Sequence, residues 1–187
     1  MNIQPIGFVD PTMIAATLAL RYGEHFDDDT RRQDAPGSAH KRTKVILLRG
    51  PENPGPENWM EDVPHIPTDV FREWTAAQDF MGRIERLMNH AYGNRELSFG
   101  KIMIVRLEPG GWVDWHRDEG PYAEAHNRFH VCLSPCWGAW LYSGGEGATM
   151  TAGNVLAFNN RALHSAANFG DIPRVNLIFD IKKPALQ

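Results

Sequence analysis

The sequence predicts a mainly β fold with supporting helices, and two observations carry this prediction. From residue 97 onward, short apolar segments alternate with turn residues, while one longer stretch before them repeats apolar residues at helical spacing. A series of short strands behind one or two helices favours a β-sandwich or small barrel whose helices support one sheet. The 187 residues and 42% hydrophobic content fit one domain covering 1–187.

The first part of the chain, 1–42, is expected to form an N-terminal helix followed by an exposed loop. Asp10 is suited to cap the helix and Pro11 to occupy its first turn. A strand is predicted over 43–50, which ends in glycine. The next segment, 51–58, contains three prolines and is expected to be irregular.

A supporting helix is predicted over 68–92. It begins near Thr68 or Asp69 and ends at Gly93, and apolar residues recur along it at three- and four-residue steps. The β core is predicted over 97–182. Its strands are expected near 99–107, 112–117, 128–134, 139–142, 146–150, 154–158, 163–168 and 173–181.

Composition excludes several classes of partner. The formal charge is −4 and no block of basic residues is present, so nucleic acid is not expected as a partner. The apolar N-terminal stretch lacks a basic start and is broken by Asp10 and Pro11, so neither a signal peptide nor a membrane span is expected. Cys132 and Cys136 are interpreted as free, small apolar residues, which indicates a reducing, cytoplasmic setting.

Three residues have the chemistry of a metal site. His116 and Asp118 form an H-x-D pair, and residues two apart at the end of a strand project from the same face. His164 lies 46 residues after Asp118 and begins a later predicted strand. Two imidazoles and one carboxylate match the facial triad of non-haem Fe(II) oxygenases, although an H-x-D pair alone often occurs by chance.

Basic residues in neighbouring predicted strands strengthen this hypothesis. Arg174 follows His164 by ten residues, and its guanidinium can bind the far carboxylate of a dicarboxylic co-substrate; the alternative is a solvated strand arginine. Arg128 and His130 share one face of an otherwise apolar strand. Burying both is costly unless an anion binds there.

The ordered motifs resemble the aspartyl/asparaginyl β-hydroxylase family of 2-oxoglutarate oxygenases over roughly residues 40–182. The series consists of Leu107 to Asp118, Arg128 to His130, Phe158 to His164 and Arg174 to Leu177. The resemblance implies a double-stranded β-helix, the jelly-roll or cupin-like fold. It also implies that iron is bound by His116, Asp118 and His164, that Arg128 and His130 contact the 2-oxoglutarate head, and that Arg174 holds its far carboxylate. Val105 departs from the pattern, because some relatives carry a serine there.

The resemblance further implies the reaction. Fe(II), 2-oxoglutarate and O2 would hydroxylate a C–H bond and release succinate and CO2, and we expect an amino-acid side chain as the target. The substrate is either a small molecule or a peptide or protein, and neither its identity nor the oligomeric state follows from the sequence. Two alternatives stay open: a cupin-like metalloenzyme that does not use 2-oxoglutarate, and a non-catalytic binding module.

Other polar residues and the large aromatics receive less specific predictions. Asn176 is expected to face the cavity beside Arg174, and His40 is expected in an exposed loop, with substrate contact at the pocket mouth as the alternative. The loops 21–42 and 51–67 and the segment Glu119–Asn127 are expected to frame that mouth. Most of the tryptophans around the metal motif are expected in the core, and four histidines at the surface: His25, His65, His90 and His126.

Overall fold

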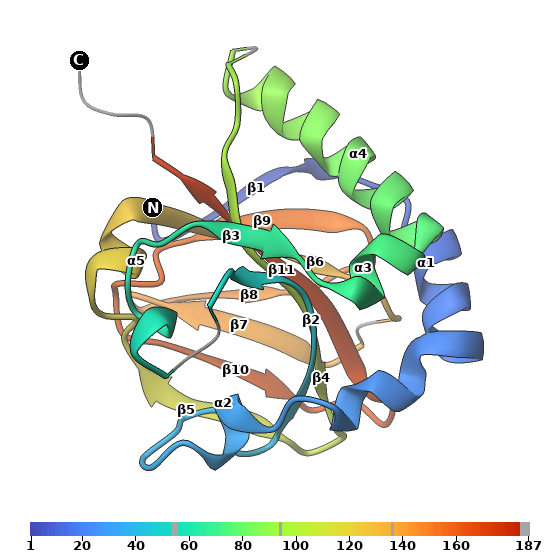
Figure 1. The fold of residues 1–187 in the computed structure, drawn as a ribbon. Coiled ribbons are helices and arrows are strands. Elements are labelled where there is room, and N and C mark those ends of the chain that lie inside the picture. Colours follow the sequence, from blue (N-terminus) through green and yellow to red (C-terminus); the bar gives the residue numbers. More distant parts are fainter. Residues whose placement is uncertain (54–55, 94, 136, 184–187) are drawn as a thin grey trace.

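Two antiparallel β-sheets form the body of the protein (Figure 1). The computed structural model describes residues 1–53, 56–93, 95–135 and 137–183. The large sheet has the strand order β1 (Ile3–Phe8), β9 (Asn154–Phe158), β6 (His126–Cys132), β11 (Arg174–Lys182), β4 (Phe99–Leu107), β2 (Thr43–Pro51) and β3 (His65–Pro67). The small sheet has the order β5 (Trp112–His116), β10 (His164–Asn168), β7 (Ala139–Ser143) and β8 (Glu146–Thr149).

The predicted mainly β fold is confirmed, and each strand expected after residue 97 is present. The strands β1 and β3 were not predicted. In β1, Pro5 and Gly7 interrupt the strand pattern, and the register with β9 shifts between them. A side chain at position 7 would meet Leu87, since an added Cβ would lie 2.7 Å from its Cδ1 atom. Edge strands accept such residues, so β1 depends on its pairing with β9 rather than on its own propensity.

The helices and helical turns of the described residues are α1 (Thr12–Thr17) with a π-helical turn (Leu18–Tyr22) and a 3-10 turn (Gly23–Asp27), α2 (Arg31–Asp34), a 3-10 turn (Pro56–Trp59), α3 (Asp69–Glu73), α4 (Thr75–Ala91) and α5 (Pro121–Ala125). Of these, α1, α3 and α4 cover one face of the large sheet. Figure 1 shows α1, α3 and α4 together along one side of the molecule. Their apolar side chains pack with those of β2, β4, β6 and β11 in the main hydrophobic core.

The predicted helix over 68–92 begins as expected but is not continuous. The Thr68 hydroxyl accepts a hydrogen bond from the Phe71 amide and caps α3. Helical geometry is then lost at Trp74, where ψ is 84°. The buried Trp74 ring stacks on Tyr22 at 4.2 Å, and its indole N–H donates to the Thr17 hydroxyl at 2.8 Å. The helix is therefore interrupted at Trp74, where the side chain contacts the N-terminal helical segment. Sequence periodicity does not show such a contact.

Strand β11 separates the core from the site because both of its faces are buried. Leu177, Phe179 and Ile181 pack in the main core under the helices. The alternate residues Arg174 and Asn176 line a pocket on the other face. Alternation along one strand therefore turns a row of polar side chains toward the space between the two sheets.

The expectation for the cysteines is wrong. Cys132 is disulfide-bonded, and the second cysteine, Cys136, lies outside the described residues. The reducing setting inferred from free thiols therefore loses its support. Among the described helices, none is long and apolar enough to span a membrane.

Candidate metal centre and its pocket

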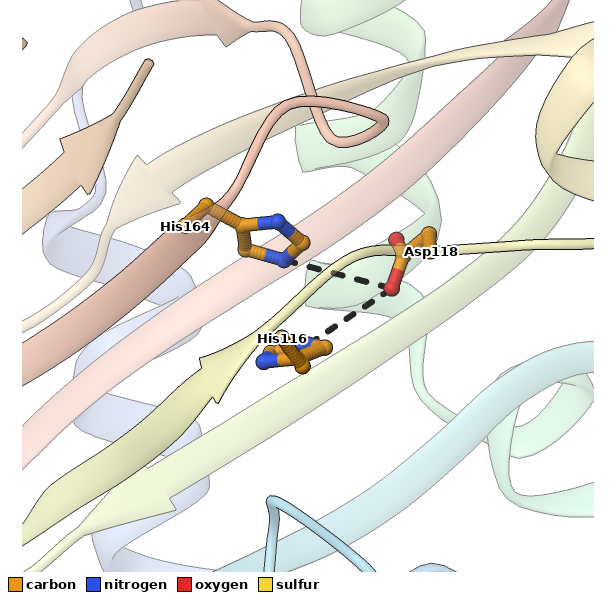
Figure 2. A group of neighbouring side chains, drawn as sticks. All are labelled: His116, Asp118 and His164. Atoms are coloured by element: carbon orange, nitrogen blue, oxygen red, sulfur yellow. Dashed lines mark ion pairs between the residues drawn. The ribbon is translucent and has the colours of Figure 1, made fainter. Parts of the chain in front are cut away.

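The three predicted metal ligands lie together where the small sheet meets the loop that follows β5. His116 ends β5 and His164 begins β10, and the two residues are direct cross-strand partners. Figure 2 shows both imidazoles directed at Asp118. The Asp118 Oδ1 atom lies 3.6 Å from His116 Nε2 and 3.9 Å from His164 Nε2, and the three ligand atoms all lie within 4.8 Å of one another.

Backbone carbonyls orient the two imidazoles. His116 Nδ1 donates to the Asp114 carbonyl at 2.8 Å, and His164 Nδ1 donates to the Ala162 carbonyl at 3.0 Å. These bonds place the proton on Nδ1 and leave the Nε2 lone pairs facing Asp118, as in metal-binding histidines. Burial lowers the pKa of His116, and it lowers that of His164 to about 4, so both rings are neutral near pH 7. Neutral imidazole is the form that binds metal.

The carboxylate of Asp118 is held through its second oxygen. Its Oδ2 atom accepts hydrogen bonds from Arg128 Nη1 at 2.5 Å and from Asn160 Nδ2 at 3.0 Å. Burial opposes ionisation, but Arg128, then His164 and the Asn160 amide, hold the pKa of Asp118 well below its usual range. The carboxylate is therefore charged, and its free oxygen, Oδ1, faces the imidazoles.

Arg128 is itself held by a residue that the sequence analysis missed. Its Nε and Nη2 atoms donate to the two oxygens of Asp180 at 2.8 and 2.9 Å, and the Tyr122 hydroxyl donates to the same carboxylate at 3.0 Å. The N–H groups of Arg128 thus bind Asp118 and Asp180, and the residue also lines the pocket, so its contact with the head of 2-oxoglutarate stays a prediction. The signal for Asp180 was present, because an acidic residue inside the apolar segment VNLIFDIK requires a buried partner.

The donor set fits a divalent iron ion. Two neutral imidazoles and one charged carboxylate are the ligands that non-haem Fe(II) sites use. The His116 Nε2 atom is buried and has no hydrogen-bond partner among the described residues. A metal ion would satisfy that atom, which is otherwise an unfavourable buried polar group.

A pocket between the sheets connects this site with Arg174. Arg174 is only 5% exposed, and among the described residues no carboxylate lies within ion-pair distance of it. Burial lowers its pKa to about 10, so it stays charged at neutral pH. With the amide oxygen of Asn176 turned toward it, Arg174 donates to that oxygen at 2.6 Å through Nη2. The confined positive charge therefore lacks a counter-ion within the described structure.

The remaining predicted residues also reach the pocket. His130 is buried on β6 and lines it, and burial followed by the charge of Arg174 lowers the pKa of its imidazole well below the usual value. Asn176 faces the cavity as expected. Val105 lines the pocket on β4, where it is the cross-strand partner of Asn176. The pocket therefore has no hydroxyl at the position where some relatives have a serine.

The N-terminal segment contributes two further residues. His40 lines the pocket and packs edge-on against the His116 ring, with 4.7 Å between ring centroids, so it is not an exposed loop histidine. Arg32 on α2 also lines the pocket and was not predicted. The predicted loop 21–42 therefore reaches the pocket at Arg32 and His40.

Several expectations about burial are wrong. His65 and His126 are buried, where they pack around the Tyr122 ring, whereas His90 is exposed and His25 is half-buried. Aromatic residues near the metal motif are more exposed than predicted, and three of them are large exposed side chains: Trp112, Trp115 and Trp137.

The family model for the aspartyl/asparaginyl β-hydroxylases matches residues 50–184. The chain belongs to this family. The match covers the metal triad and the pocket strands after β2, but it does not include Arg32 and His40. None of the curated proteins matches the chain.

Several solved oxygenase structures have the same fold as this chain. A collagen prolyl hydroxylase from Paramecium bursaria Chlorella virus-1, solved with 2OG, has a TM-score of 0.60 at 12% identity, over 98% of this chain and 97% of that one. A prolyl hydroxylase from Trichoplax adhaerens, in complex with a hypoxia inducible factor peptide fragment, has a TM-score of 0.59 at 15% identity, over 97% and 83%. A Pseudomonas putida prolyl-4-hydroxylase has a TM-score of 0.56 at 14% identity, over 98% and 92%. At such identities the likeness shows the fold alone, and the predicted jelly-roll core is confirmed.

Proposed function

We propose that this protein is an Fe(II)- and 2-oxoglutarate-dependent oxygenase that hydroxylates a C–H bond of an amino-acid side chain. The observation that carries the proposal is the position of Arg174. A buried guanidinium that lacks a carboxylate partner among the described residues lies in the pocket that His116 and His164 of the metal triad also line. A dicarboxylic co-substrate would neutralise this charge and reach the metal with its other end.

The residues of the chain have separate tasks in this proposal. His116, Asp118 and His164 would hold Fe(II), which supplies the oxidation of the substrate C–H bond when it is bound with 2-oxoglutarate and O2. Arg174 would bind the far carboxylate of 2-oxoglutarate, and His130 lines the same pocket and is suited to contact its head. Arg128 positions Asp118 through Nη1 and also lines the pocket beside His130, where it would contact the head of 2-oxoglutarate.

The substrate in this proposal is an amino-acid residue, either free or within a peptide or protein. Membership of the aspartyl/asparaginyl β-hydroxylase family supports an amino-acid side chain. The Trichoplax structure with a bound peptide fragment supports the peptide form, although at 15% identity. The apolar lining around the metal, including Val113, Leu141 and Phe158, would help to exclude water from the reacting centre.

An anaerobic titration tests the proposal. Fe(II) and then 2-oxoglutarate are added to the purified protein, and the visible charge-transfer band of the chelated complex is followed. We expect the band in the wild type and in Arg106→Gln, since Arg106 pairs with Glu108 outside the pocket. We expect Arg174→Gln to bind Fe(II) normally but to lose the band at 2-oxoglutarate concentrations that saturate the wild type.

Each other outcome favours a different interpretation. Fe(II) binding with no band in the wild type would favour a cupin-like metalloenzyme that does not use 2-oxoglutarate. Failure to bind Fe(II) would remove the metal assignment and favour a non-catalytic module. A band that persists in Arg174→Gln would remove Arg174 from the co-substrate site.

A further inference from the structure

A second guanidinium without a carboxylate partner among the described residues lies in the pocket, at a different level from Arg174. Arg32 on α2 lines the pocket and reaches the strand β4, where its Nη1 atom lies 3.2 Å from the sulfur of Met103. Its Nη2 atom lies 3.0 Å from His40 Nε2. Because arginine only donates, His40 accepts this bond through Nε2 and carries its proton on Nδ1.

The segment that carries Arg32 and His40 is held in place beside the metal ligands. The Ser38 hydroxyl donates to the Arg32 carbonyl at 2.5 Å and accepts from the His40 amide at 3.0 Å. The Ala39 carbonyl accepts from the amide of Asp114 in β5 at 3.0 Å. Figure 1 shows α2 next to β5, which ends in His116. The two side chains are therefore preorganised rather than free loop residues.

Arg32 is charged, and its charge is not neutralised by a contact within the described structure. Burial and the nearby Arg128 lower the pKa of Arg32 to about 10, so the guanidinium is protonated at neutral pH. Among the described residues, no carboxylate lies within ion-pair distance of Arg32. The adjacent Arg31 differs, because it binds Asp29 through Nη2 at 2.8 Å on the surface. Only one of two consecutive arginines is thus directed at the pocket.

The far carboxylate of 2-oxoglutarate does not account for Arg32. Arg174 is opposite Leu107 in the register of β11 with β4, whereas Met103, the contact of Arg32, is opposite Ile178. Four residues along a strand correspond to about 13 Å. This distance joins the backbone positions of Leu107 and Met103, so the two arginines meet the pocket wall at different levels, which favours separate anions for them. If Arg174 takes the far carboxylate of 2-oxoglutarate, Arg32 is left for a different anion near the metal.

We propose that Arg32, supported by His40, binds a carboxylate of the substrate and selects substrates that carry one. This inference rests on the proposed oxygenase function and adds the chemical class of its substrate. A guanidinium forms paired, charge-assisted hydrogen bonds with a carboxylate, and in a dry pocket such bonds discriminate strongly against an uncharged amide. The carboxylate belongs either to the main chain of an amino acid or to an acidic side chain, and both present the same group to Arg32.

The test uses defined probes on the anaerobic protein with Fe(II) and 2-oxoglutarate. One set consists of N-acetyl-L-amino acids, and the other consists of their N-methylamides, in which only the aspartate and glutamate members keep a carboxylate. Binding is measured by calorimetry and by the shift of the visible band. We expect binding only from probes with a carboxylate, and the two sets together identify whether it is the main-chain or the side-chain group.

Variants then assign the effect to Arg32. We expect Arg32→Gln to weaken binding of the active probe by about tenfold or more, with the Kd for 2-oxoglutarate within about twofold of the wild type. Arg32→Lys should retain part of the affinity, because it keeps the charge but not the paired geometry. Arg31→Gln is the matched control and should behave as wild type. Thermal melting of each variant checks that it is folded.

For the wild type, two results would overturn the inference: equal binding of acids and amides, or no binding of any carboxylate probe to a complex with a normal band. For Arg32→Gln, two further results would overturn it: unchanged probe affinity, or an equal loss of affinity for 2-oxoglutarate and for the probe. If the band itself is absent in the wild type, the proposed oxygenase function fails. In that case calorimetry would still test the carboxylate site. Probe binding that is lost in Arg32→Gln would support the site, and probe binding that is absent or unchanged in the variant would overturn it.

Discussion

Replacing Asp180 with asparagine should affect both stability and metal binding, because this residue begins a series of contacts that runs through Arg128 to Asp118, a proposed metal ligand. Asp180 is 1% exposed and binds Arg128 through both oxygens. Arg128 in turn binds the oxygen of Asp118 that faces away from the imidazoles. Asp180→Asn keeps the shape of the side chain but removes one of the two negative charges that flank Arg128.

The expected magnitudes follow from burial. Removing one partner of a buried ion pair costs about 3–5 kcal/mol of unfolding free energy. We expect a value near the lower limit, about 3 kcal/mol, because asparagine can still accept one hydrogen bond and Arg128 keeps Asp118. Losing a residue that orients a metal ligand lowers metal affinity by about 10–100-fold. The same range is expected here for Fe(II), since Arg128 would no longer be held in one position.

Urea unfolding and anaerobic Fe(II) titration measure the two effects separately. Asp114→Asn is the control, because this exposed carboxylate lies on β5 beside the metal ligands and, within the described part of the chain, its side chain accepts a hydrogen bond only from the Trp112 indole. We expect little change in the control. If Asp180→Asn lowers stability but leaves the Fe(II) dissociation constant unchanged, the chain from Asp180 to Asp118 does not position the metal ligand. If stability is unchanged, the charge pairing itself is refuted.

Three further predictions concern the triad, a buried lysine and the helix break. His164→Ala should abolish tight Fe(II) binding and succinate release while circular dichroism stays that of a folded protein; full turnover would remove the metal assignment. Burial, followed by the charge of Arg128, lowers the pKa of Lys101 to about 7 from 10.5, so between these values the folded state binds fewer protons than the unfolded chain. Stability should therefore rise with pH in this window by up to about 1.4 kcal/mol per unit, and urea unfolding of Lys101→Met should lack that slope; equal slopes would contradict the shift. Trp74→Ala should cost about 3–5 kcal/mol in the same assay, because a fully buried ring is removed, and a cost below about 1 kcal/mol would show that its contacts do not stabilise the fold.

Several parts of the protein follow from short-range patterns in the amino-acid sequence. The strands after residue 97 follow from alternating apolar segments and turn residues, and the start of the helix at Thr68 follows from its capping chemistry. The H-x-D pair and the distant His164 were recognisable as a candidate metal site because ligand chemistry restricts the residue types. The structure brings these three residues within 4.8 Å of one another.

Which charges are neutralised depends instead on contacts between residues far apart in the chain. Arg128 and Arg174 are both arginines in buried strands, yet Arg128 binds Asp180 and Asp118 while no carboxylate within the described ranges pairs with Arg174. Arg32 belongs to a segment that looks like an exposed polar loop, and its contact with Met103 spans 71 residues. Such contacts join positions far apart in the chain, so local periodicity and propensity carry no information about them. Burial raises the energetic cost of a positive charge that has no counter-ion, and the binding of an anion reduces that cost.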